Sequence, residues 1–214
     1  MPNSDFVQVL VTFLVLLLSL TVHEAAHAWT ADRLGDPTAR LLGRISLNPA
    51  VHIDPIGTIL FPLIALTTGA PILGWAKPVP VNIGRLRGNW KQQYMLIAAA
   101  GPASNLVLAT IAALALRGLL AGEVDGSSAP AVRMLTASLF LAVRLNVLLA
   151  VFNMIPVPPL DGGNVLSGLL HGPAERAFDS LRRYGFLILY GLMLSGILWE
   201  IVTPPENLLL SWLL

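Results

Sequence analysis

Apolar residues fill the chain in long runs, and the polar residues gather between them. Four runs reach the roughly 20 residues that a helix needs to cross a bilayer. They are Phe6–Ala31, Gln93–Leu120, Ala131–Ile155 and Tyr184–Val202. No Lys or Arg precedes the first run and it is long enough to span, so we interpret it as a retained helix rather than a signal peptide. The pattern predicts an all-α polytopic membrane protein with four full transmembrane helices.

Two segments depart from this pattern. The apolar stretch Ile56–Leu73 contains two glycines and two prolines, which predict a kinked span or a re-entrant segment. Gly74–Gly84 alternates valine and isoleucine with proline and asparagine, which predicts a short β-strand or hairpin at the membrane face. The tail Pro204–Leu214 is apolar but too short to span, and we expect it at the membrane interface.

Composition supports a membrane environment. The 214 residues are 55% hydrophobic and only 12% charged, with a mean hydropathy of +0.73, whereas soluble domains carry about 25% charged residues. A net charge of +1 gives no support for nucleic-acid binding, and the absence of cysteine excludes disulfides and thiolate metal sites. We expect one membrane-embedded domain over residues 1–214, with a catalytic core at about 6–163 and a C-terminal helix and tail at about 164–214.

The basic residues indicate how the chain is oriented. If Ile56–Leu73 returns to the side that it left, ten of the thirteen Lys and Arg residues share one face. The positive-inside rule then favours four full spans and a re-entrant element. We expect the protein in the cell membrane, with its N-terminus on the external side. Arg144 falls near the middle of the third run, where it is expected to face a polar cavity or to pair with an acid such as Glu123, Asp125 or Glu200.

The first run ends in the motif HEAAH. His23 and His27 lie one helical turn apart, so their imidazoles project from the same face, with Glu24 beside them. This H-E-x-x-H arrangement is typical of zinc hydrolases, in which two histidines bind Zn²⁺ and the glutamate takes a proton from the attacking water. A chance occurrence is less credible here because ionisable groups inside a span are costly and usually functional.

A catalytic zinc site needs a third protein ligand, and acids and histidines are scarce in this chain. The candidates are His52 and Asp54 in one loop, and Asp161 just beyond the third apolar run. All three lie on the basic side of the membrane, as His23 and His27 do, so the residues alone leave the choice open.

A family resemblance decides between the candidates. HEAAH inside a span, GPASN at 101–105 and NMIPVPPLDGG at 153–163 together resemble the site-2 protease family of intramembrane zinc metalloproteases. NPAVHIDPIGT and GWAKPVPVN resemble its small bacterial and archaeal members, and no PDZ-like or nucleotide-sensing module is recognisable. The resemblance implies that Asp161 is the third zinc ligand and that Asn153 positions substrate or stabilises the oxyanion.

Several polar residues have two interpretations. Asn105 is either an active-site residue or a hydrogen-bonding residue between helices, because the small residues before it allow a close helix approach. Asn153 could instead cap backbone freed by Pro156. His52 is expected slightly more as a surface loop residue than as part of the site. Asp54 is expected in a turn, and His171 as an exposed helix-end residue.

The predicted function is cleavage of peptide bonds within or near transmembrane segments, with zinc bound by His23, His27 and Asp161 and with Glu24 activating the water. The expected partners are a transmembrane protein or peptide substrate and the lipid bilayer, with the active site toward the cytoplasmic side. A metal transporter is one alternative, but it leaves Glu24 unexplained. A non-catalytic scaffold is another, and the complete motif set argues against it.

Overall fold

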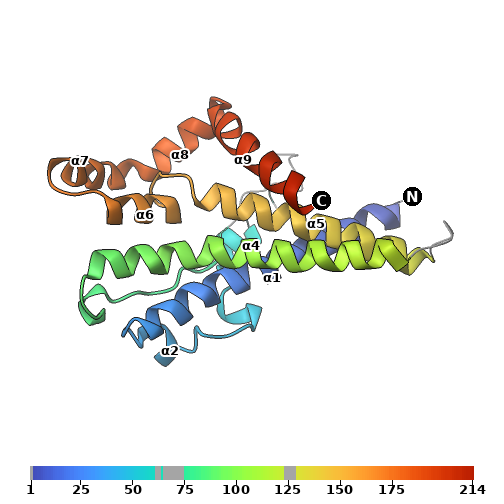
Figure 1. The fold of residues 1–214 in the computed structure, drawn as a ribbon, viewed down its shortest axis with the longest axis horizontal. Coiled ribbons are helices and arrows are strands. Elements are labelled where there is room, and N and C mark those ends of the chain that lie inside the picture. Colours follow the sequence, from blue (N-terminus) through green and yellow to red (C-terminus); the bar gives the residue numbers. More distant parts are fainter. Residues whose placement is uncertain (1, 61–63, 65–74, 123–128) are drawn as a thin grey trace.

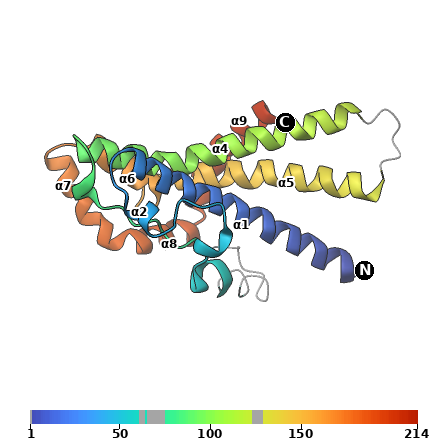
Figure 2. The ribbon, with the colours of Figure 1, turned by 90° about the horizontal axis from the view of Figure 1, so that it is seen from below.

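Three long helices form the centre of the molecule. The computed structural model describes residues 2–60, 64, 75–122 and 129–214. Each central helix is long and apolar enough to cross a membrane. The central helices are α1 (Pro2–Arg33), α4 (Trp90–Gly122) and α5 (Pro130–Asn153). Figure 1 shows α4 and α5 side by side, and Figure 2 shows α1 diverging from them toward its N-terminus. The first three predicted spans are thus confirmed as helices.

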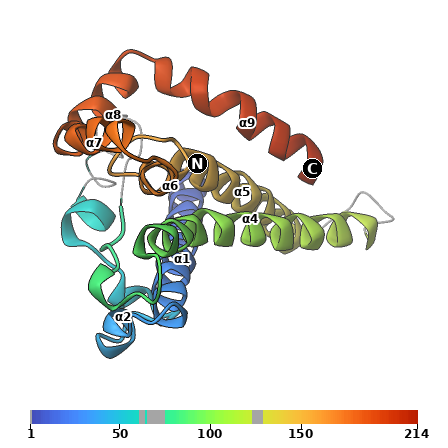
Figure 3. The same ribbon diagram turned by 60° about the vertical axis from the view of Figure 1, so that its left-hand side comes forward.

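Shorter elements surround these helices. Five lie on the C-terminal side of α5, where Figure 3 shows α6, α7, α8 and α9 arching over it. They are α6 (Asp161–Leu169), α7 (Pro173–Leu181), the 3₁₀ turn η4 (Arg182–Tyr184), α8 (Gly185–Leu194) and α9 (Ile197–Leu213). The remaining elements between α1 and α4 are α2 (Thr38–Leu41), η1 (Pro49–Val51), the π-helical turn η2 (Pro55–Leu60) and η3 (Ile83–Arg85).

Small residues set the packing of the central helices. Three alanines of α4 and two valines of α5 form a buried cluster that leucines of α9 help to cover. In a membrane, small side chains let helix backbones approach closely, so van der Waals contact replaces the missing hydrophobic driving force. The members of this cluster are Ala109, Ala112, Ala113, Val143 and Val147.

The prediction of a fourth full span at Tyr184–Val202 is not supported. A break at Ser195 and Gly196 separates α8 from α9, and the chain bends there by 80°. Gly196 has φ +81°, a left-handed conformation that favours glycine, and it stands directly before α9. The described residues therefore contain three continuous helices that are long and apolar enough to span, with a fourth only if the bent pair crosses as a broken one. The tail predicted at the interface is the second half of α9 rather than a separate segment.

The β-strand predicted within Gly74–Gly84 is wrong for the part of it that the structure describes, residues 75–84, which contain no strand. This segment is extended, but Pro78 and Pro80 have no N–H to donate to a sheet ladder. The N–H groups of Val79 and Asn82 donate instead to carboxylates, Glu24 and Asp36 respectively. Alternation of apolar and polar residues thus marks an extended chain that is held by side chains.

The predicted kinked or re-entrant element falls largely outside the described residues. At its two edges, however, the chain meets itself. The N–H of Trp75 donates to the carbonyl of Gly57 at 3.3 Å, and the hydroxyl of Thr58 donates to the carbonyl of Trp75 at 2.8 Å. Gly57 and Thr58, just before the undescribed residues, therefore lie next to Trp75, just after them.

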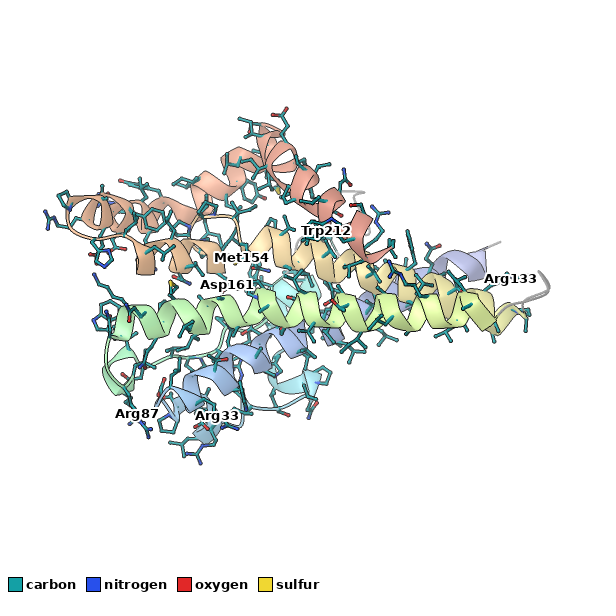
Figure 4. The ribbon with its side chains drawn as sticks, viewed as in Figure 1. Arg33, Arg87, Arg133, Met154, Asp161 and Trp212 are labelled. Atoms are coloured by element: carbon teal, nitrogen blue, oxygen red, sulfur yellow. The ribbon has the colours of Figure 1, made fainter. Side chains whose placement is uncertain are left out.

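Arginines lie at both ends of the helix assembly. Figure 4 places Arg33 and Arg87 together at one end of the molecule and Arg133 at the other. Arg144 is exposed on α5 and forms no ion pair within the described residues. Two of its suggested partners, Glu123 and Asp125, lie outside those residues, and Glu200 is exposed on α9.

Candidate metal centre

Two histidines and one aspartate from distant parts of the chain converge between α1, α4 and α6. Their ligand atoms all lie within 4.8 Å of one another. The Asp161 Oδ2 atom is 3.0 Å from Nε2 of His23 and 3.4 Å from Nε2 of His27. Ligands at tetrahedral zinc, bound at 2.0–2.1 Å, lie about 3.3 Å from one another. The spacing therefore fits three ligands of one zinc ion.

The outer ring nitrogens of the two histidines determine which atoms face the centre. Nδ1 of His23 lies 2.6 Å from the side-chain oxygen of Asn105, and Nδ1 of His27 lies 2.7 Å from the carbonyl oxygen of Ile97. Oxygens of this kind accept hydrogen bonds, so each Nδ1 carries the proton. In the neutral rings both Nε2 lone pairs then point at the Asp161 carboxylate, and three electron-pair donors converge. A cation satisfies this arrangement.

A buried polar network holds Asn105 in place. Its amide nitrogen donates to the side-chain oxygen of Asn146 at 2.8 Å, and the amide of Asn146 donates to the hydroxyl of Ser19 at 2.9 Å. The network thus joins α4, α5 and α1 behind His23. Sequence reasoning missed Asn146 and Ser19 as supporting residues. The available signal was a polar side chain inside an apolar span.

Gly101 forms the floor of the metal centre on α4. A Cβ atom built there would lie 2.4 Å from Nε2 of His27 and 2.5 Å from Nε2 of His23. Any side chain at this position would enter the space between the imidazoles. The glycine of the GPASN motif is therefore explained by the space that the metal centre needs.

Close backbone packing brings Asp161 to the histidines. Asp161 begins α6, and the next two residues, Gly162 and Gly163, are buried against the chain that leaves α5. A Cβ at Gly162 would lie 2.2 Å from the carbonyl oxygen of Met154. Larger residues would push the start of α6 away from the chain that leaves α5. Figure 4 shows Asp161 on the side of α6 that faces α4.

The pKa of the Asp161 carboxyl depends on the protons of the two imidazoles. Burial raises this pKa, but in the metal-free site, where the rings can also carry protons on Nε2, their hydrogen bonds and charges outweigh the burial and lower the pKa from 3.8 to about 2. A metal ligand must be deprotonated to bind, and an anionic carboxylate meets that requirement.

Glu24 lies beside the centre rather than in it. It is half-buried, and its Oε2 atom accepts a hydrogen bond of 3.1 Å from the backbone N–H of Val79. It follows His23 directly on α1, so its side chain leaves the helix at a different angle from the two imidazoles. A carboxylate in this position can exchange a proton with a water molecule at the centre.

The structure separates the other candidates from the metal centre. The expectation that His52 is a surface residue is wrong, because it is 2% exposed, and its Nε2 donates to the carbonyl of Ser46 at 2.9 Å. The Asp54 carboxylate accepts the N–H groups of Ile56 and Gly57 and so forms the predicted turn. His171 is exposed next to the end of α6, as predicted.

Asn153 lies at the end of α5, and the hydrogen bond that its side chain makes to the described residues is local. Its amide donates to the carbonyl of Leu149 at 2.9 Å. It is half-buried and makes no contact with the three ligands that the structure records as a hydrogen bond. Its role in substrate positioning stays a prediction.

Comparison with known proteins assigns the family. The family model described as peptidase family M50 matches residues 116–195, which include Asp161. The chain is 35% identical over 202 residues to "Putative zinc metalloprotease YwhC" of Bacillus subtilis, covering 92% of this chain and 88% of that protein. The chain belongs to peptidase family M50. It is also 32% identical over 181 residues to "Putative zinc metalloprotease Rip2" of Mycolicibacterium smegmatis, covering 84% of this chain and 64% of that protein. No solved structure matches it.

Membership in family M50 confirms the resemblance to site-2 proteases that the motifs indicate. As an M50 peptidase the protein is a membrane-embedded zinc metalloendopeptidase. The three converging donors fit that cofactor, because two imidazoles and one carboxylate leave a fourth position open, as catalytic zinc sites require. The family model and the HEAAH motif fall in different parts of the chain, and the metal centre joins them.

Proposed function

We propose that this M50 peptidase hydrolyses peptide bonds within or near transmembrane segments of membrane-protein substrates. The observation that carries the proposal is the position of the metal centre. Two of its ligands lie on α1, a helix long and apolar enough to span a bilayer, and the third approaches from α6. A peptide bond that reaches this centre must come from a segment at or within the membrane.

The proposed roles follow from the geometry. His23, His27 and Asp161 hold zinc, with Asn105 fixing the tautomer of His23. Zinc, when bound, supplies a Lewis acid that polarises the scissile carbonyl and acidifies a water molecule. Glu24 accepts the proton of the attacking water and delivers it to the departing amine. Asn153 is proposed to position the substrate or to stabilise the oxyanion.

The proposed topology places the catalytic centre toward the cytoplasmic side. Arg33 and Arg87 mark one end of the helix assembly, and the positive-inside rule assigns such an end to the cytoplasm. The contact between Gly57 and Trp75 supports a re-entrant segment, because a chain that crossed the membrane once between them would separate them. We propose that residues 1–214 act as one membrane-embedded unit.

Two other functions could use the same residues. A metal transporter would use the same three ligands, and a scaffold would bind transmembrane segments without cutting them. Neither needs a carboxylate held beside the metal centre, and the hydrogen bond from Val79 to Glu24 gives that carboxylate a defined place. This observation favours hydrolysis.

Glu24→Gln tests the proposal, because it removes the proton acceptor and keeps the size and the hydrogen-bond acceptor. Cleavage should fall by at least about 100-fold, in the range that general acid–base catalysis supplies. The zinc content should stay at that of the wild type. The measurement compares membrane proteomes of cells expressing either form, in which fragments cut within spans should accumulate only with the wild type.

Glu200→Gln is the matched control, since Glu200 is exposed on α9 and is not among the converging metal ligands, and this variant should cleave as the wild type does. Unchanged cleavage by Glu24→Gln would exclude the proposed mechanism. Zinc flux that survives the substitution would point to a transporter.

A further inference from the structure

An extended segment, Lys77–Asn82, crosses the molecule beside Glu24. Its sequence is KPVPVN, and its two prolines have no N–H. Val79 therefore has the only N–H among residues 78–80, and this group donates to Oε2 of Glu24 at 3.1 Å. A residue before proline is restricted to extended conformations, which applies to both Lys77 and Val79. The sequence thus keeps the segment straight and presents one donor at this point.

One side of the segment is anchored at Lys77. Its N–H donates to the carbonyl of His52 at 2.8 Å, and its carbonyl accepts a hydrogen bond from the guanidinium of Arg44. His52 is held in turn by its bond to the carbonyl of Ser46, and Arg44 is buried. Burial lowers the pKa of Arg44 and the charge of Glu24 raises it, so the guanidinium lies within electrostatic range of that carboxylate.

The other side is anchored at Asn82 by a fully buried carboxylate. Asp36 is 0% exposed, and its Oδ2 atom accepts the N–H of Asn82 at 2.6 Å. Its Oδ1 atom accepts the N–H of Thr38 at 3.0 Å and the hydroxyl of the same residue at 2.5 Å. A buried charge is costly unless it is hydrogen-bonded. Here the bonds fix the segment to the loop that follows α1.

We propose that Asp36 and Val79 are positioning residues for catalysis: Asp36 fixes the extended segment Lys77–Asn82 so that the N–H of Val79 holds Glu24 in its reactive orientation. The proposal rests on the proposed role of Glu24. It also links two sequence stretches. GWAKPVPVN contains the extended segment, and NPAVHIDPIGT contains His52, whose carbonyl accepts the N–H of Lys77.

The hydrogen bond restricts a flexible side chain at one atom only. A glutamate has three rotatable side-chain bonds, and the bond from Val79 fixes Oε2. Oε1 accepts no hydrogen bond from the described residues, so it is the oxygen that remains open to take a proton from water. Positioning of this kind acts on turnover, because a misplaced base slows proton transfer without weakening substrate binding.

The first test compares two substitutions at Val79. Val79→Pro removes the N–H and keeps an extended backbone, whereas Val79→Ala removes the isopropyl group and keeps the N–H. For cleavage of a purified transmembrane substrate, kcat of Val79→Pro should fall about 10- to 100-fold with KM within about twofold. The kcat of Val79→Ala should fall by less than about threefold. The zinc content of both variants should equal that of the wild type.

The second test uses Asp36→Asn, which keeps the shape of the side chain and removes its charge. The kcat should fall about 10-fold while zinc content is retained. Asp32→Asn is the matched control, because Asp32 lies near the end of α1, just before the loop that holds Asp36, and makes a partly exposed ion pair with Arg40. This control should keep the wild-type kcat.

A readout independent of activity is amide hydrogen exchange in the peptide that covers residues 75–82. In the full-length protein, with and without added zinc, Glu24→Ala should release one slowly exchanging amide, that of Val79. Asp36→Asn should release the amides of Val79 and Asn82. Asp32→Asn should release neither.

Two results would overturn the inference. One is a kcat for Val79→Pro equal to that of Val79→Ala, and the other is unchanged exchange of the Val79 amide in Glu24→Ala. Either would leave the segment as a structural tether with no influence on Glu24. These results differ from a failure of the proposed function, in which Glu24→Gln would cleave normally. If only the positioning inference is wrong, Glu24→Gln stays inactive and the Val79 and Asp36 variants stay active.

Discussion

At the residue scale, the metal centre depends as much on missing atoms as on ligands. Gly101 approaches both imidazoles so closely that a methyl group would occupy the space beside their Nε2 atoms. Side chains in a packed interior cannot move apart without cost, and the histidines are further held by Asn105 and Ile97. The ligand geometry is therefore specified from two sides, by contacts behind the rings and by open space in front of them.

Gly101→Ala is expected to abolish zinc binding. The added Cβ would lie 2.4 Å from Nε2 of His27, so the imidazoles must turn away. Their Nε2 atoms would then no longer point at one metal position. Zinc per protein, measured by inductively coupled plasma mass spectrometry, should fall below about a tenth, and cleavage should fall with it. Gly118→Ala is the control on the same helix, because no atom lies within 4 Å of a Cβ at that position. Wild-type zinc content in Gly101→Ala would show that the rings can move aside.

The residue types that bind metal were predictable, whereas the residues that support them were less so. His23 and His27 follow from helical spacing, and Asp161 followed from resemblance once spacing had left His52 and Asp54 as alternatives. Asn146 escaped because one polar side chain in an apolar run does not reveal which helix it faces. Its partner on α1, Ser19, is 127 residues away in the sequence, and no local pattern joins them.

At the element scale, the same network joins the three central helices. Asn146 donates to Ser19 on α1 and accepts from Asn105 on α4, so one side chain of α5 connects both neighbours and, through Asn105, reaches His23. Hydrogen bonds between membrane helices contribute roughly 0.6–2 kcal/mol each. The network therefore stabilises helix association and orients a metal ligand at once.

Asn146→Ala should weaken zinc binding without removing a ligand. Asn105 would lose the nearer acceptor of its amide and keep only the carbonyl of Ser19 at 3.5 Å, so it could rotate and loosen the hydrogen bond to Nδ1 of His23. Outer residues of this kind affect metal affinity by about 10- to 100-fold, and we expect about 10-fold, measured by competition with a chromogenic chelator. Ser138→Ala is the control on α5, since its hydroxyl donates to the carbonyl of Met134 of its own helix and to no other described residue. Equal affinity in Asn146→Ala and Ser138→Ala would contradict the coupling.

The elements themselves were predictable to different degrees. Long apolar runs predicted α1, α4 and α5 to within a few residues, because hydropathy reports burial in lipid directly. The prediction of a fourth continuous span was wrong because hydropathy does not show where a helix bends. The left-handed Gly196 turns the chain within an apolar stretch of sequence. The prediction of a β-strand was wrong because apolar and polar residues alternate in two kinds of structure. One is a β-sheet, and the other is a single extended segment whose N–H groups donate to side chains.

At the scale of the whole molecule, the C-terminal bend raises the question of how α8 and α9 lie in the membrane. The contact between Arg117 and Trp212 bears on it, since the guanidinium donates to the carbonyl of Trp212 at 3.3 Å. Arg117 stands in the last turns of α4, at the end of that helix away from Arg33 and Arg87. The end of α9 therefore reaches the half of the molecule opposite to the basic end, as a broken span that crosses would require.

Single cysteines can test this topology directly, because the chain contains no cysteine of its own. In intact cells, a membrane-impermeant maleimide should label Ala131→Cys at the start of α5 and Ser211→Cys near the end of α9. His171→Cys, between α6 and α7, should react only after permeabilisation, since it lies with the basic loops that the positive-inside rule assigns to the cytoplasm. Protection of Ser211→Cys together with labelling of Ala131→Cys would mean that α8 and α9 turn back without crossing the membrane. Labelling of His171→Cys in intact cells would instead place the basic loops outside the cell. The metal centre lies between α1, α4 and α6, and α6 ends next to His171, so the same three labels also determine from which side water reaches Glu24.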